Sequence, residues 1–192
     1  MIAGAPESGK STLLTAYLTK YGQAARLYDT ANQRAPDPRI TCGQSIFHPG
    51  QPSLMDWLLI MPVLVAAYSR AMVALIDETP SALSEAEMGA FASVLQQDRN
   101  VEMVGKAKGQ GGFGVRFTSF RLQAWLEPSI RSAIQHYLIF PLSEKQDRDK
   151  FEQAWGAEGA FELLQSSPPF SFIHALPNAA REWHIHRPGD LP

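Results

Sequence analysis

Near its amino terminus the chain carries the stretch Gly4-Ala5-Pro6-Glu7-Ser8-Gly9-Lys10-Ser11. This stretch matches the pattern G-x-x-x-x-G-K-[ST] at every fixed position. Glycines in such a loop let backbone N–H groups turn towards phosphate oxygens, and the helix that follows adds its positive end. Lys10 is then expected to reach the β- and γ-phosphates, and Ser11 to offer its hydroxyl to a magnesium ion. The stretch, together with Thr12, therefore predicts a binding site for a nucleoside triphosphate.

The flanking sequence places this loop between a strand and a helix. Residues 1–3 are apolar and predict a short strand, while apolar residues at helical spacing predict a helix over 11–21 that ends at Gly22. Further strands are expected at 24–28, 72–76, 115–120 and 137–141, and further helices at 54–70, 84–98, 128–136 and 147–155. The Pro- and Gly-rich residues 32–52 favour a loop. Alternating strands and helices predict an α/β fold, a three-layer αβα sandwich around a mainly parallel sheet.

The pair Asp77-Glu78 is the second indication of a site. It follows the continuous apolar run at 72–76, which is typical of a buried parallel strand. Open α/β sheets bind their ligands at the carboxyl ends of the strands, where this pair is expected to lie. Asp77 is suited to the magnesium shell, and Glu78 to orienting or deprotonating a water molecule. Beside the phosphate-binding loop, the pair predicts hydrolysis of the triphosphate.

Length and composition limit the class of protein. The chain has 192 residues, of which 45% are hydrophobic and 19% charged, so it can form one compact domain without disulfides. The net charge of −2 excludes a global positive field for nucleic acid, although not a ring with a few positive loops. We expect a single P-loop domain over 1–192, with 160–192 as a C-terminal extension that carries a β-hairpin.

The second half of the chain resembles the FtsK/HerA superfamily of ATPases. Residues 114–123 (GVRFTSFRLQ) resemble the strand that ends there in a polar step, and residues 126–131 (LEPSIR) resemble the segment that follows it. The resemblance, which extends over nearly all of 1–155, implies a RecA- or FtsK/HerA-like fold, ATP with Mg²⁺ as ligands and a homo-oligomeric ring, commonly hexameric.

Within that superfamily, this short chain resembles the genome-packaging ATPases of icosahedral DNA viruses with an internal membrane. The resemblance implies an ATP-driven translocase that packages double-stranded DNA into a preformed capsid. It also implies capsid or membrane vertex proteins as partners, and a location in the host cytoplasm or at the packaging vertex of a virion. The alternatives are an assembly ATPase of the filamentous-phage type, a small-molecule P-loop kinase and a regulatory module without hydrolysis, against which Glu78 counts.

Several residues have roles that the sequence leaves open. The FtsK/HerA superfamily places a polar residue, the sensor, after the strand that corresponds to 115–120. In this chain the sensor is either Gln123 or Arg121, because the sequence can be aligned with the family's polar step in two ways. An arginine supplied to a neighbouring subunit's site would come from Arg99, Arg121 or Arg131.

Basic, histidine and aromatic residues also have two interpretations each. Lys106, Lys108 and Arg116 surround a glycine-rich stretch that either faces DNA phosphates in a ring pore or forms a solvent-exposed connection. The histidines at 174, 184 and 186 lack a cysteine or acidic partner at zinc-like spacing, which favours a surface role over a metal site. We expect a small C-terminal core or subunit contacts, rather than base-stacking platforms, from Trp155, Phe161, Phe170 and Trp183.

Overall fold

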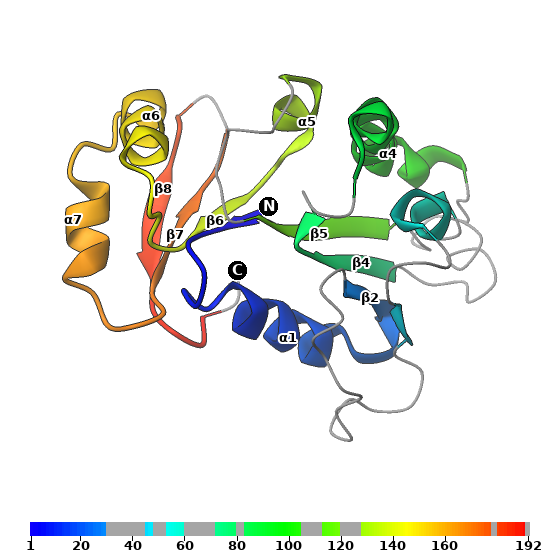
Figure 1. Cartoon of the computed structure of the whole chain (residues 1–192), viewed down its shortest axis with the longest axis horizontal. Helices are drawn as coiled ribbons and strands as arrows, with labels where there is room; N and C mark the ends of the chain where they lie inside the picture. Colours follow the sequence, from blue (N-terminus) through cyan, green and yellow to red (C-terminus); the bar gives the residue numbers. More distant parts are fainter. Residues whose placement is uncertain are drawn as a thin grey trace.

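The structure, a computed structural model of the chain, describes residues 1–29, 45–47, 53–59, 72–79, 83–104, 113–119, 128–177 and 180–190. In this part of the chain an eight-stranded sheet is covered by helices (Figure 1). The strands are β1 (Ile2–Ala3), β2 (Ala25–Asp29), β3 (Ser45–Phe47), β4 (Met72–Asp77), β5 (Phe113–Ser119), β6 (Tyr137–Ile139), β7 (Phe172–Ala175) and β8 (Trp183–His186). The helices are α1 (Lys10–Tyr21), η1 (Gly22–Ala24), α4 (Glu85–Val104), α5 (Pro128–Ala133), α6 (Lys145–Trp155) and α7 (Ala160–Gln165), with a further helical segment at 54–59.

The order of the strands in the sheet is β3-β2-β4-β5-β1-β6-β7-β8. All neighbours from β3 to β6 pair in parallel, whereas β7 and β8 are added antiparallel. Strand β5 therefore lies between β1 and β4, and the carboxyl ends of these strands meet at one edge of the sheet. That edge is where ligands bind in open α/β sheets.

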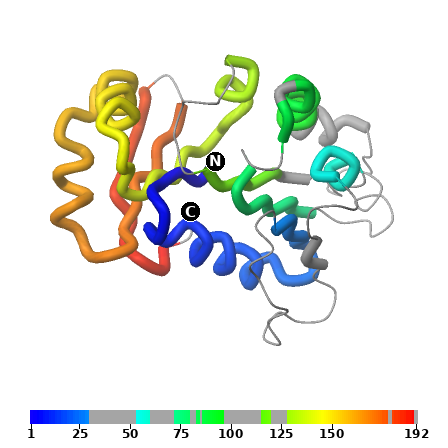
Figure 2. Tube along the Cα trace, in the orientation of Figure 1, coloured from blue at the N-terminus to red at the C-terminus, as the bar shows by residue number. Residues whose placement is uncertain are grey.

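Two hydrophobic clusters pack on opposite faces of the sheet. One cluster joins the strands to α4, α5, α6, α7 and the segment at 54–59, and the other joins them to α1. Figures 1 and 2 show α1 on one side of the strands and α4, α5 and α6 on the other. Successive residues of β4 alternate between the clusters, with Ile76 in the first and Leu75 in the second, as the pleat of a strand requires. The expected three-layer αβα sandwich is therefore confirmed.

Most of the expected elements lie within a few residues of their predicted bounds, and two differ. Residues 45–47, expected in a loop, form β3 and pair in parallel with β2. The short α7 was not expected, although Phe161 and Leu164 lie three residues apart and are both buried on one side of it. The expected helix over 54–70 is found at 54–59, and its remainder lies outside the described residues.

The carboxyl-terminal part of the chain continues the sheet. Strands β7 and β8 form the expected hairpin. Because β7 pairs with β6, the hairpin adds two strands to the sheet. The division at residue 160 stays a prediction. No helix in the described part of the chain is long and apolar enough to cross a membrane.

Candidate nucleotide-binding and hydrolytic site

The phosphate-binding loop is tied to the strands on both sides of β1. The Gly4 N–H donates a hydrogen bond to the Ser119 carbonyl at the end of β5 (3.1 Å), and the Ala5 N–H donates to the Pro141 carbonyl beyond β6 (2.8 Å). The loop then turns through left-handed conformations at Glu7 (φ 60°) and Gly9 (φ 108°) before α1 begins. The sequence thus places this loop at the carboxyl edge of the sheet, with the amino end of α1 beside it.

Two glycines of the loop are required by close contacts. A Cβ atom on Gly9 would lie 2.9 Å from Cδ1 of Phe170 and 3.2 Å from Cε1 of Phe140. A Cβ atom on Gly4 would lie 2.6 Å from both the Phe140 Cβ and the Ser8 Oγ. Distances below 3 Å are shorter than carbon atoms tolerate, so neither position accepts a side chain without a shift of its neighbours.

Replacing Gly9 by alanine is therefore expected to destabilise the protein by about 1–3 kcal/mol, because the methyl group overpacks against two rings at a positive φ. Thermal unfolding followed by circular dichroism measures this change. Gly89→Ala is the matched control, since a methyl group on this glycine of α4 meets no atom within 4 Å. An unchanged melting temperature for Gly9→Ala would contradict the argument.

Lys10 is buried at the start of α1, with its side chain folded back onto the loop. Its Nζ donates hydrogen bonds to the carbonyls of Gly4 (2.9 Å) and Ala5 (2.8 Å). Burial lowers the pKa of Lys10, and the carboxylates of Glu78 and Asp77 act in the opposite direction. The structure therefore brings the lysine of the loop and both predicted carboxylates into one electrostatic site.

Asp77 and Glu78 lie at the carboxyl end of β4. Asp77 is buried, and its Oδ1 accepts a hydrogen bond of 2.8 Å from the Thr118 hydroxyl of β5. The same hydroxyl oxygen accepts a hydrogen bond of 2.7 Å from the Glu78 N–H. Glu78 has a φ of 55°, a conformation that is rare for residues other than glycine and that turns the chain sharply after the strand.

Burial raises the pKa of Glu78, while Lys10 lowers it and Asp77 raises it further. A carboxylate with increased proton affinity is a better general base than an exposed one, because the ideal catalytic pKa lies nearer the working pH. Glu78 thus has the environment expected of a group that takes a proton from water.

Thr118 was missed when the sequence was considered alone. The sequence predicts the polar sensor at Gln123 or Arg121, which both lie outside the described residues. The signal that could have found it is the Thr118-Ser119 pair at the end of the strand, where polar side chains interrupt an apolar pattern. In the sheet, Phe117 is opposite Ile76, so the next residue, Thr118, lies beside Asp77.

The remaining residues predicted to bind nucleotide lie in the loop and the first turn of α1. The Ser8 hydroxyl is buried and has no hydrogen-bond partner among the described residues. Ser11 and Thr12 are exposed on the first turn of α1. Pro6 takes part in the loop through its position alone, since it has no backbone N–H to donate.

The donors at this edge fit a magnesium ion held with a substrate. Mg²⁺ binds through one or two protein oxygens together with phosphate oxygens and water, and the Ser11 hydroxyl and the Asp77 carboxylate are donors of that kind. Among the described residues, no three His, Cys, Asp or Glu side chains are close enough to hold a metal ion by themselves. His174 lies in β7 with its Nε2 at 2.9 Å from Nδ1 of His136, and the surface role of His174, His184 and His186 stays a prediction.

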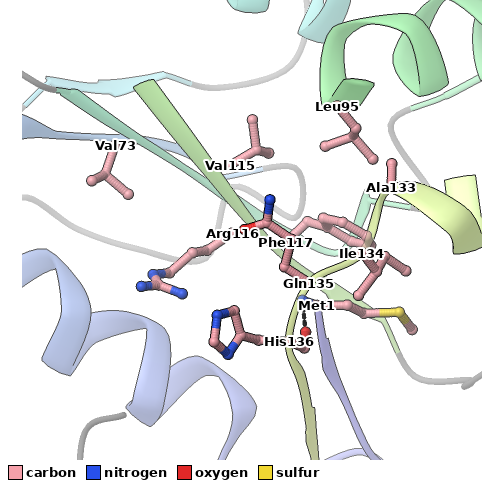
Figure 3. A pocket seen from close by; sticks show the side chains of 10 residues that line it. All are labelled: Met1, Val73, Leu95, Val115, Arg116, Phe117, Ala133, Ile134, Gln135 and His136. Atoms are coloured by element: carbon pink, nitrogen blue, oxygen red, sulfur yellow. Dashed lines mark hydrogen bonds between the residues drawn. The ribbon is translucent and has the colours of Figure 1, made fainter. Parts of the chain in front are cut away.

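Arg116 lies away from the phosphate-binding loop, in the middle of β5. Its guanidinium carbon is 4.4 Å from the centre of the Tyr17 ring, and its Nη2 donates a hydrogen bond of 2.8 Å to the Tyr21 hydroxyl. It also lines a cavity of about 190 Å³ at the amino ends of the strands, together with His136 (Figure 3). Arg116 is thus held against α1, and its contact with DNA stays a prediction.

The other candidate basic residues are placed only in part. Arg131 is exposed on α5, before β6 begins, and therefore lies towards the opposite edge of the sheet from the loop. Arg99 lies in α4, but its side chain is outside the described part. Lys106 and Lys108 lie outside the described residues as well. The arginine that a neighbouring subunit would receive stays unassigned among Arg99, Arg121 and Arg131.

The fold and the site define the class of the protein as a P-loop NTPase in which an additional strand, β5, separates the phosphate-binding strand from the strand that carries the acidic pair.

The structure is similar to that of the genome packaging NTPase B204 from Sulfolobus turreted icosahedral virus 2 in complex with sulfate. The TM-score is 0.70 and the identity 17%, over 97% of this chain and 94% of that chain. B204 in complex with ATP-gammaS gives a TM-score of 0.63 and 18% identity, over 97% and 95%.

The EssC ATPases 2 and 3 from Geobacillus thermodenitrificans are similar over 98% of this chain and 39% of theirs, with a TM-score of 0.50 and 16% identity. Comparisons with protein-family models and with curated protein sequences found no match. These likenesses confirm the P-loop ATPase fold that the resemblance implied. At such low identities they establish the fold.

Proposed function

We propose that this protein is an ATPase that drives double-stranded DNA of a viral genome into a preformed capsid. The observation that carries the proposal is the meeting of Lys10, Asp77 and Glu78 at one edge of the sheet, with Thr118 between the two carboxylate residues. This arrangement joins phosphate binding to activation of water. The likeness to a genome packaging NTPase over 97% of this chain and 94% of that chain supports the packaging role.

The roles follow from the chemistry of each group. The loop amides and the Lys10 ammonium would bind and neutralise the β- and γ-phosphates, whose charge increases in the transition state. Glu78 would hold the attacking water and take its proton, while Thr118 holds the backbone of Glu78 and the side chain of Asp77. Ser11 and Asp77 would hold a magnesium ion, whose positive charge would help to neutralise the phosphates.

Phosphoryl transfer to water can serve processes other than packaging. An assembly ATPase of the filamentous-phage type would use the same site without DNA, and a small-molecule P-loop kinase would transfer the phosphoryl group to an acceptor hydroxyl. Stimulation of hydrolysis by DNA separates packaging from both alternatives. Phosphorylation of a nucleoside or sugar identifies the kinase.

The experiment is steady-state ATP hydrolysis with and without double-stranded DNA, together with the mass of the protein in solution. A ring that hydrolyses ATP faster with DNA, and loses hydrolysis in Glu78→Gln, supports the proposal. If the protein is a monomer and DNA does not change its rate of ATP hydrolysis, the packaging role is excluded and only the ATPase activity remains.

The DNA contact in this proposal belongs to a homo-hexameric ring whose pore is lined by Lys106 and Lys108, with Arg116 near the base of the same stretch. Phosphate contacts of this kind hold DNA without reading bases. The ring would act in the host cytoplasm or at the packaging vertex, against capsid or membrane vertex proteins.

Replacing Lys106 and Lys108 together by alanine is expected to lower stimulation by DNA several-fold and to leave hydrolysis without DNA unchanged. Each lost phosphate contact should also reduce the salt dependence of DNA binding by about one unit of slope. The matched control is the double replacement of Lys145 and Lys150, which removes the same charge from exposed positions of α6. Equal effects of the two double variants would point to net charge rather than to a pore contact.

A further inference from the structure

Phe170 lies in a tight turn directly before β7. The Ser171 N–H donates a hydrogen bond of 3.1 Å to the Pro168 carbonyl, which closes a four-residue turn. Pro169 occupies the second position, where its ring fixes φ near −65°. Phe170 occupies the third position with a φ of 66°. A turn with these properties is of type II, in which glycine or asparagine normally occupies the third position.

Phenylalanine at this position is unfavourable for the isolated chain in two ways. A positive φ strains any residue with a Cβ atom, and such strain persists mainly at ligand-binding and catalytic sites. In addition, 57% of the Phe170 surface is exposed, whereas Phe140 and Phe172 nearby are buried. Of the two expected roles of Phe170, a place in a small C-terminal core is wrong and a subunit contact stays a prediction. Phe161 does belong to the core, and Trp155 and Trp183 pack against it.

The exposed ring is in contact with the phosphate-binding loop. A Cβ atom on Gly9 would meet the Phe170 ring at 2.9 Å and its Cβ at 3.6 Å, so the ring rests on the backbone of Gly9. Strand β7 is antiparallel to β6, which places its first residues at the carboxyl edge of the sheet. Phe170 thus stands at the same edge as the loop, and its turn shapes the border of the site.

The direction of a bound triphosphate follows from the order of the strands. The γ-phosphate belongs beside Lys10, Asp77 and Glu78, on the side of β1 that faces β5 and β4. The nucleoside end of the molecule then points to the other side of β1, towards β6 and β7. In the described part of the chain, Phe170 is an exposed aromatic residue on that side, within contact of the loop.

We infer that the Phe170 ring, presented by the strained turn at 168–171, is the platform on which the base of the nucleotide stacks. The inference rests on the proposed function, since it assigns the base end of the same nucleotide. Stacking of a base on an aromatic ring is tolerant of base identity, because every base has a π-face. Phe170 would therefore add affinity for nucleotides over inorganic polyphosphate, with little choice among bases.

The test compares a non-hydrolysable ATP analogue with inorganic tripolyphosphate, which lacks a base, by calorimetric titration in the presence of magnesium. Phe170→Gly removes the ring and accepts the positive φ, so it should not lower the melting temperature. We expect this variant to lose about tenfold in affinity for the analogue, within the range of base stacking, and to keep its affinity for tripolyphosphate. Phe170→Trp should retain the affinity for the analogue. Leu163→Ala alters a similarly exposed residue (54%) of α7 and should change the affinity for neither ligand.

Each contrary result has a separate meaning. If Phe170→Gly weakens both ligands equally, or neither, the base platform is overturned and the nucleotide site stands. A lower melting temperature with equal loss for both ligands would assign the ring to packing and overturn the inference as well. If the unaltered protein binds neither ligand, the proposed ATPase function fails, and the base platform fails with it.

Discussion

Replacing Glu78 by glutamine is expected to lower kcat for ATP hydrolysis by about 10²- to 10⁴-fold, the usual contribution of a general base. The amide has nearly the shape of the carboxylate, but it cannot take a proton from water. Glu78 is the half-buried carboxylate whose pKa is raised by burial, next to Lys10 and Asp77. The phosphate-binding loop is untouched, so the affinity for ATP should change little.

The measurement is single-turnover hydrolysis beside a binding titration, so that chemistry and affinity are separated. Glu158→Gln, at an exposed position, makes the same chemical change away from the site and should leave both quantities unaltered. Hydrolysis by Glu78→Gln at the unaltered rate would remove the general-base role. Loss of ATP binding would instead show that Glu78 maintains the shape of the loop.

Replacing Thr118 by valine is expected to lower both stability and hydrolysis. Valine keeps the branched shape but lacks the hydroxyl, so Asp77 loses a donor at 2.8 Å and the Glu78 N–H loses its acceptor at 2.7 Å. Leaving buried groups without partners should reduce the free energy of unfolding by about 2–3 kcal/mol. Loss of a partner that orients a metal-binding carboxylate typically lowers activity by a further factor of about 10–100.

Thr118→Ser is the control, because it restores the hydroxyl while removing only a methyl group. Serine should recover most of the kcat even if the lost methyl group lowers the melting temperature somewhat. This split between kcat and stability separates a positioning role from simple packing. Unaltered kcat in Thr118→Val would show that Asp77 and Glu78 keep their places without the hydroxyl.

The positions of the phosphate-binding loop and of the two carboxylates could largely be predicted from local sequence. The loop at residues 4–11 encodes its own shape through glycines at the positions where a Cβ atom would collide, and Lys10 follows at the start of a helix. Asp77 and Glu78 could be assigned because a continuous apolar run predicts a buried strand whose end is exposed to ligand. Both patterns lie within a few neighbouring residues, so they can be recognised in the sequence without knowledge of the fold.

Contacts between distant segments could not be predicted in this way. The short strand β3 forms because its backbone pairs with β2, in a stretch whose composition favours a loop. Thr118 becomes important only because β5 lies beside β4, so that one hydroxyl reaches both Asp77 and Glu78. The residues next to Thr118 in the sequence do not predict its contacts with Asp77 and Glu78.

The sequence by itself determined the αβα class, the phosphate-binding loop and the two carboxylates, because spacing and hydrophobic periodicity act between near neighbours along the chain. The tertiary structure alone decided the order of the strands, the partner of Asp77 and the position of Phe170 against Gly9. These depend on backbone hydrogen bonds between strands and on close packing of residues far apart in the sequence. Such long-range contacts are selected by the free energy of the whole fold, and no short pattern specifies them.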